Sequence, residues 1–265
     1  MHRLHNSRAS HAEPRDLEGF TDSTLEGDWD TAGPDAIASL RPFGRDVPEQ
    51  QIPDASCTSA TEPASPLDQA LALAARGRRL DAIMLLRDLV HERPTATELR
   101  LALAQLLEES GEPEEALAEL GTALDHTKDR APTLVRRGAV YARLGQPKSA
   151  EEDFREATRS NATYWIAYRY LGSTQLRLGR PEEAAATLRD ALSLAPQDPE
   201  TVLYLGEALL TLGRLDEAFG ELKRAVDLAP SSPRAYTQLG RLFDRLGLTE
   251  EAMAMHRKAR EVTTE

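Results

Sequence analysis

The sequence predicts an all-α fold, an α-solenoid of six helix–turn–helix repeats that follows a disordered acidic segment. Three observations lead to this prediction. From residue 63 onward the sequence repeats itself every 34 residues without an insertion. Glycine occupies the fifteenth position of every repeat, and alanine occupies the twentieth. A fixed period of this length is typical of stacked helical hairpins, each of which buries its apolar face against its neighbours.

Residues 1–62 differ in composition from the rest of the chain. They carry twelve acidic side chains against five lysines and arginines, with five prolines and no sustained apolar period. A segment of this kind buries too little apolar surface to offset the entropy lost on folding. We therefore expect residues 1–62 to form a disordered acidic tail.

Residues 63–265 form the predicted array. The glycine at the fifteenth position predicts the end of each first helix, because glycine tolerates the left-handed backbone that a tight turn needs. Small residues at the eighth and twentieth positions predict a close approach of two helices, with larger residues such as Leu188 and Leu222 beside the contact. The expected repeats are 63–96, 97–130, 131–164, 165–198, 199–232 and 233–265.

Two further patterns make the repeat more specific. The first helices carry Tyr236-x-x-Leu239-Gly240-x-x-Phe243 and Val202-x-x-Leu205-Gly206-x-x-Leu209, and a second helix carries Ala218-x-x-x-Leu222 with Pro230 after it. In these positions the chain resembles tetratricopeptide repeat proteins over residues 63–265. The resemblance implies a right-handed solenoid whose concave surface, lined by the first helices, holds a partner protein or peptide.

Charge and composition narrow the classes of partner. The net charge of −12 disfavours phosphate backbones and anionic lipid surfaces, so we expect neither nucleic acid nor membrane insertion. No stretch approaches the roughly 18 apolar residues of a membrane-spanning helix. Cys57 is the single cysteine and has no partner for an internal disulfide, which favours a reducing, cytoplasmic setting. No residues show catalytic or metal-ligand spacing, so we expect no enzyme activity, metal or cofactor.

Helical spacing and the resemblance together point to binding residues on the first helices. Arginine pairs with carboxylates in two-point geometry and tyrosine offers rigid contact area, so these residues suit an acidic peptide with apolar anchors. The alternative is that the arginines are solvated or paired with Glu200, Glu207 or Asp244. The candidates are Arg136, Arg143, Arg169, Tyr170, Arg177, Tyr204, Arg234, Arg241 and Arg245.

The acidic tail is itself a candidate ligand for this surface. The stretch around Leu25 and Trp29 combines acidic residues with apolar anchors, so it can dock on the arginines and compete with partners. The alternative is a solubilising linker, which is the usual role of acidic segments that contain proline.

The last repeat offers a third candidate surface. No capping helix follows it in the sequence, so we expect exposed stacking residues that favour self-association. The charged residues of the last helix, such as Arg257 and Lys258, are the alternative, since they already make this helix soluble. The candidates are Leu242, Leu246, Met253 and Met255.

Three functional classes follow from these observations. The first is an adaptor that recognises a partner protein or peptide on the concave face. The second is a self-assembling scaffold, and the third is a regulatory subunit of an enzyme or a secretion complex. The adaptor is the favoured interpretation.

Overall fold

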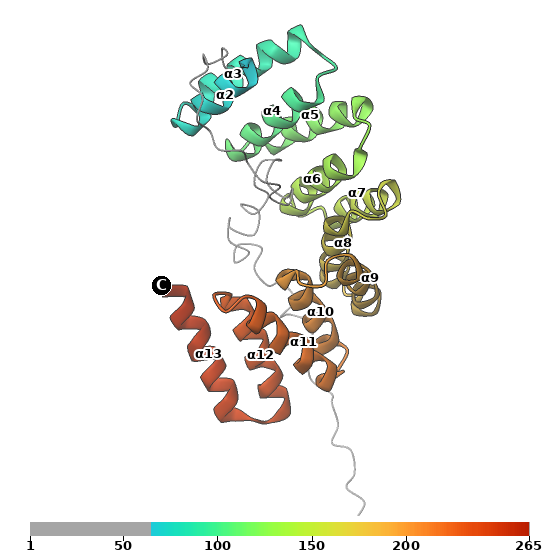
Figure 1. Ribbon diagram of the computed structural model, residues 1–265, viewed down its shortest axis with the longest axis vertical. Coiled ribbons are helices and arrows are strands. Elements are labelled where there is room, and N and C mark those ends of the chain that lie inside the picture. Colours follow the sequence, from blue (N-terminus) through green and yellow to red (C-terminus); the bar gives the residue numbers. More distant parts are fainter. Residues whose placement is uncertain (1–64, 265) are drawn as a thin grey trace, which may run out of the picture. The chain divides into compact units, whose positions relative to one another are not determined.

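The computed structural model describes residues 65–264, with the side chains of residues 65–263. These residues belong to one compact unit, Thr58–Glu265. The predicted tail of residues 1–62 lies outside the described residues. Figure 1 shows the helices following one another along the array, with α2 and α3 at one end and α12 and α13 at the other.

The described residues form six pairs of antiparallel helices and contain no strand, which confirms the predicted all-α solenoid of six hairpins. The first helices of the pairs are α2 (Pro66–Ala75), α4 (Thr97–Glu109), α6 (Arg130–Arg143), α8 (Trp165–Arg177), α10 (Pro199–Thr211) and α12 (Pro233–Leu246). The second helices are α3 (Arg79–Glu92), α5 (Pro113–His126), α7 (Pro147–Ser160), α9 (Pro181–Leu194), α11 (Leu215–Leu228) and α13 (Thr249–Thr264).

Glycine at the fifteenth position ends each first helix, as predicted. These six glycines have φ between 69° and 81°, a left-handed conformation that strains any other residue. The residue after each glycine donates its backbone N–H to a carbonyl five residues earlier, as Gln146 does to Tyr141 at 2.9 Å. This pattern satisfies carbonyl groups that the helix end leaves without partners. The turn is therefore the same in every repeat.

A residue without a side chain sets the approach of the two helices in the last four repeats. The eighth position is glycine there, and an added Cβ at Gly206 would lie 2.6 Å from Leu222 of the second helix. Gly138 faces Phe154 and Gly172 faces Leu188 in the same way. Each bulky side chain occupies the volume that a β-carbon would take, so the two positions form a matched pair.

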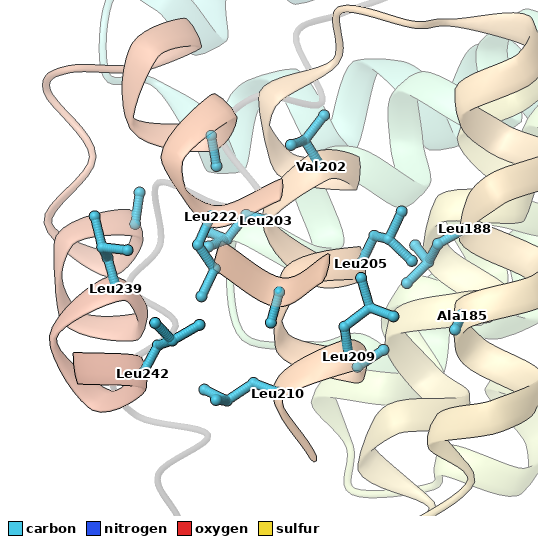
Figure 2. Close-up of a cluster of buried hydrophobic side chains, with 14 of the residues drawn as sticks. Ala185, Leu188, Val202, Leu203, Leu205, Leu209, Leu210, Leu222, Leu239 and Leu242 are labelled. Carbon is cyan, nitrogen blue, oxygen red and sulfur yellow. The ribbon is translucent and has the colours of Figure 1, made fainter. Parts of the chain in front are cut away.

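The core follows from these hairpin contacts. Buried leucines, valines and alanines from neighbouring repeats merge into clusters, the largest of which covers α9 to α12. Figure 2 shows Leu205 and Leu209 of α10 beside Leu188, while Leu239 and Leu242 of α12 lie on the other side of the cluster. Stacking thus buries both faces of α10, and each repeat depends on its neighbours for stability.

The matched pair predicts opposite effects of two glycine substitutions. Gly206→Ala forces a methyl group against the fully buried Leu222, so we expect a net loss of about 1–2 kcal/mol after the gain in helix propensity. Gly220→Ala is the matched control, because a Cβ there meets no atom within 4 Å. It should stabilise the array by about 0.5–1 kcal/mol. Urea denaturation followed by circular dichroism measures both, and equal midpoints would contradict the pairing.

Candidate binding surface on the first helices

The first helices share a continuous surface along the array. Besides the contacts between consecutive helices, α2 contacts α4, and α8 contacts both α6 and α10, which in turn contacts α12. We call this surface the A-helix face and define it by the second, fifth, sixth, ninth, twelfth and thirteenth positions of the repeats. All nine predicted binding residues lie on α6, α8, α10 or α12. The structure separates them into groups with different partners.

Arg136 and Arg143 of α6 share one carboxylate from the preceding repeat. Arg136 Nε lies 3.2 Å from Oε1 of Glu108, and Arg143 contacts the other carboxylate oxygen. The Glu108 side chain is only 10% exposed, so solvent screens these pairs little. The two arginines thereby join α6 to α4, and the one carboxylate of Glu108 offsets part of their positive charge.

Arg169 of α8 is held at the N-terminus of α10, the first helix of the following repeat. Its Nη1 lies 3.0 Å from Glu200 and 3.4 Å from Asp198, and its guanidinium also lies over the rings of Trp165 and Tyr170. Burial lowers the pKa of Arg169, but these two carboxylates outweigh it and raise the pKa above its ordinary value. Arg169 is therefore an inter-repeat contact.

Tyr170, the next residue, stacks on the buried Phe154 with ring centroids 5.3 Å apart. Burial raises the pKa of its hydroxyl. Phe154 is the residue that fills the space left by Gly138, so Tyr170 continues the hairpin core onto the A-helix face.

Arg234 of α12 lies between an aromatic ring and a carboxylate of α10. Its guanidinium is 4.4 Å from the centroid of the Tyr204 ring, and its Nη2 donates to Oε2 of Glu207 at 2.8 Å. Burial raises the pKa of Glu207, although the charges of Arg234 and Arg241 and the Gln238 side chain offset part of this effect. Within residues 65–263, Oε1 of Glu207 accepts no hydrogen bond.

Two more arginines surround this group. The protein around Arg177 desolvates its guanidinium and lowers its pKa to about 10, an effect that Arg234 strengthens and Tyr204 opposes. Arg241 is exposed and makes no ion pair within residues 65–263, though its charge acts on Glu207. We call Arg177, Tyr204, Glu207, Arg234 and Arg241 the Tyr204 cluster. Three guanidinium groups and one carboxylate give it an excess of positive charge.

Arg245 has a different role, because it donates to the backbone carbonyl of Leu210 and so links α12 to α10. Only some of the nine predicted binding residues are thus available to a ligand. The pairing of Arg169 with Glu200 and of Arg234 with Glu207 follows the alternative interpretation of the sequence. The Tyr204 cluster holds an excess of two positive charges, against an excess of one where Arg136 and Arg143 share Glu108.

The sequence interpretation missed Glu108 as a binding partner of arginines. A signal was present, because Glu108 stands at the twelfth position and therefore on the A-helix face. The acidic partners predicted from the sequence, Glu200, Glu207 and Asp244, all belong to the last two repeats, and none lies beside Arg136 or Arg143.

The remaining candidate residues divide between buried, exposed and undescribed positions. Leu25 and Trp29 lie outside the described residues. Leu242 was expected on an exposed surface, but it is fully buried at the tenth position, which packs into the core. Met255 is half-buried against the same core. Leu246 and Met253 are 44% and 59% exposed.

Other chemistry is not evident in this part of the chain. Among the described residues, no three histidine, cysteine or acidic side chains come together as metal ligands would. Within the same range, every helix is too short or too polar to cross a bilayer.

Comparison with known proteins identifies the repeat. Models described as "Tetratricopeptide repeat" match residues 73–137 and, with a second model, residues 135–199, 174–233 and 203–261. The matched segments run without a gap from residue 73 to residue 261. A search of the curated proteins found no match.

Solved structures share the fold. YrrB, described as a TPR protein with an unusual peptide-binding site, is 25% identical, with a TM-score of 0.55 over 68% of this chain and 93% of that chain. PilF from Pseudomonas aeruginosa is 20% identical, with a TM-score of 0.62 over 72% and 87%. MamA from Desulfovibrio magneticus is 24% identical, with a TM-score of 0.57 over 63% and 95%.

The shared carboxylate predicts unequal roles for two adjacent glutamates. Glu108→Gln leaves Arg136 and Arg143 without a countercharge, so we expect a loss of about 1–3 kcal/mol in unfolding free energy. Glu109→Gln removes only an exposed pair with Arg79 and should change stability by less than about 0.5 kcal/mol. Urea denaturation of both variants tests this difference. A Glu108→Gln protein as stable as the Glu109→Gln protein would show that the arginines do not depend on Glu108.

Proposed function

We propose, because this chain belongs to the tetratricopeptide repeat family, that it is a protein–protein interaction adaptor whose A-helix face holds a segment of a partner protein. Proteins of this family are generally interaction modules. The proposal goes further in naming the surface and the chemistry of the ligand. We propose that the Tyr204 cluster binds an acidic segment of the partner.

The observation that carries this proposal is the charge imbalance of the Tyr204 cluster. Arg136, Arg143 and Arg169 contact carboxylates of their own chain. In the Tyr204 cluster, Glu207 pairs with Arg234 and is also influenced by the charge of Arg241, while the charge of Arg234 acts on Arg177, so three guanidinium groups share one carboxylate. The lowered pKa of Arg177 reflects this environment, since burial and a neighbouring cation both disfavour its charged form. A carboxylate from a ligand would relieve that cost.

Tyr204 adds contact area to the same cluster. Its ring already lies under the Arg234 guanidinium, so an arriving carboxylate meets a guanidinium whose position is fixed. A preorganised arginine loses less side-chain entropy on binding than a solvated one does. YrrB is described as a TPR protein with a peptide-binding site, which supports a peptide-binding role for this fold. The positive charge of the Tyr204 cluster favours an acidic peptide.

The tail of the chain supplies a probe with this chemistry. Residues 18–43 carry six acidic residues and one arginine together with several apolar side chains. We also propose that this stretch, through Leu25 and Trp29, occupies the A-helix face and competes with partners. The support for this is complementary charge and composition. A linker that never binds is the alternative.

A self-assembling scaffold is the second candidate function. The exposed Leu246 and Met253, with Leu248 at 41% exposure, support it, because exposed apolar side chains that lie together favour association. The residues of the core, Leu242 among them, take no part. The same exposed surface also suits a regulatory subunit of a larger complex. The single cysteine of the chain supports a cytoplasmic location.

A peptide titration tests the adaptor proposal. A labelled peptide of residues 18–43 is added to residues 58–265, which form one compact unit with its own core, and anisotropy is followed at several salt concentrations. We expect saturable binding that weakens as salt rises. Arg177→Glu with Arg241→Glu should weaken it at least about tenfold, because the charge of the Tyr204 cluster changes sign.

The control variant carries the same change in charge at another surface. Arg159→Glu with Arg257→Glu alters two exposed residues of second helices, on α7 and α13. Equal weakening by both double variants would indicate attraction to net charge alone and would contradict a site. In the same titration, weaker binding by the full chain supports masking by the tail, and a growing mass in light scattering without peptide binding favours the scaffold.

A further inference from the structure

The two halves of the A-helix face differ in charge. Over residues 65–263, its positions on α2, α4 and α6 hold four acidic and two basic residues. These positions therefore sum to a charge of −2, although Arg136 and Arg143 both contact Glu108 and Glu109 makes an exposed pair with Arg79 of α3. On α8, α10 and α12 the same positions hold five basic and three acidic residues. The face is therefore negative at one end and positive at the other.

Among residues 65–263, the exposed large hydrophobic residue at the positions of the A-helix face lies in the negative half. Leu71 of α2 is 40% exposed, and Leu67, Leu101 and Ala102 beside it are half-buried against the core of the first repeats. Two of these positions, the fifth and the ninth, hold Arg169 and Arg241 in later repeats. A shallow apolar strip thus runs along α2 and α4 and is absent from α12.

We propose that the ligand is bipartite, with an apolar anchor on α2 and α4 and an acidic cluster on the Tyr204 cluster, and that it binds in one direction only. This inference rests on the proposed function. The apolar strip accepts an anchor because it continues the core, and burial of one Leu or Phe side chain gives about 1.5–3 kcal/mol. Charge complementarity then fixes the direction.

The reversed direction is disfavoured at both ends. An acidic cluster placed on α2 and α4 meets Asp68, Glu98 and Glu109, and like charges at an interface repel. The apolar anchor would then lie against the guanidinium groups of Arg177 and Arg241 and would add to the cost of their desolvation. Both penalties oppose the same orientation.

The array also sets the distance between the two parts of the ligand. The first helices α4 and α10 are three repeats apart, and packed helices lie 8–10 Å from each other, so the two surfaces are about 25–30 Å apart. An extended chain covers about 3.3–3.6 Å per residue, which gives a separation of about eight residues. A ligand with a much shorter spacer reaches one surface but not both.

Synthetic peptides test this arrangement with residues 58–265. The first peptide carries a Leu-Phe-Leu anchor, an eight-residue Gly/Ser spacer and four glutamates, and the second carries a two-residue spacer. A third peptide contains the four glutamates alone. We expect the eight-residue spacer to improve binding at least about tenfold over the glutamates alone, and the two-residue spacer to give little gain. Equal affinity of the two spacers would overturn the inference.

A nitroxide label then reports the direction. With the label beside the glutamates, NMR signals of Leu210 methyl groups should broaden and those of Leu101 should not, and a label on the anchor should give the reverse. Broadening of both sites from either label would overturn a single direction. Leu71→Glu should remove the gain from the anchor and leave the glutamate peptide unaffected, with Leu80→Glu on the second helix α3 as the matched control.

These outcomes separate the inference from the proposal on which it rests. If the glutamate peptide fails to bind, or binds equally well to Arg177→Glu with Arg241→Glu, the acidic-ligand function itself is wrong. If it binds at the Tyr204 cluster and the anchor adds nothing, only the bipartite ligand is wrong.

Discussion

The close approach of two helices at a residue without a side chain determines the geometry of the later hairpins, and the A-helix face depends on that geometry. In repeats three to five, the bulky residue of the second helix fills the space above the glycine of the first, as Phe154 does above Gly138. Identical spacing then places the same positions of each repeat on the same surface. The surface of the first helices is a consequence of packing inside each pair.

The period made the hairpins predictable, since the glycines and small residues recur at positions where the local geometry requires them. The partners of the arginines were harder to predict. Which carboxylate meets Arg136 depends on how α6 approaches α4, and the period alone does not specify that approach. Leu242 shows the same limit. Leu242 stands at the tenth position of its repeat. Only a comparison with the tenth positions of other repeats, where Leu106 and Val140 are also buried, shows that this position belongs to the core.

His256 of the last repeat illustrates how a changed residue is accommodated. It stands where other repeats have leucine or phenylalanine, its ring lies over Gly240, and its Nε2 is 2.9 Å from Asp244. The two helices keep their close contact at Gly240, and the polar ring of His256 has Asp244 as its partner. Most charged residues of the A-helix face likewise have a partner within the array, as Arg136 has in Glu108 and Arg169 has in Glu200. We propose that ligand binding uses the Tyr204 cluster, where positive charge is in excess, and the apolar strip on α2 and α4.

We propose above all that the Tyr204 cluster takes the acidic ligand, while arginines outside it, such as Arg136 and Arg169, keep their carboxylate partners within the protein. Side-chain Nε–Hε NMR signals of arginine measure this directly when an acidic peptide is added to residues 58–265. The account predicts that the signals of Arg177 and Arg241 shift in proportion to occupancy, while those of Arg136 and Arg169 stay in place. Shifts spread evenly over all arginines, or confined to Arg136 and Arg143, would contradict it.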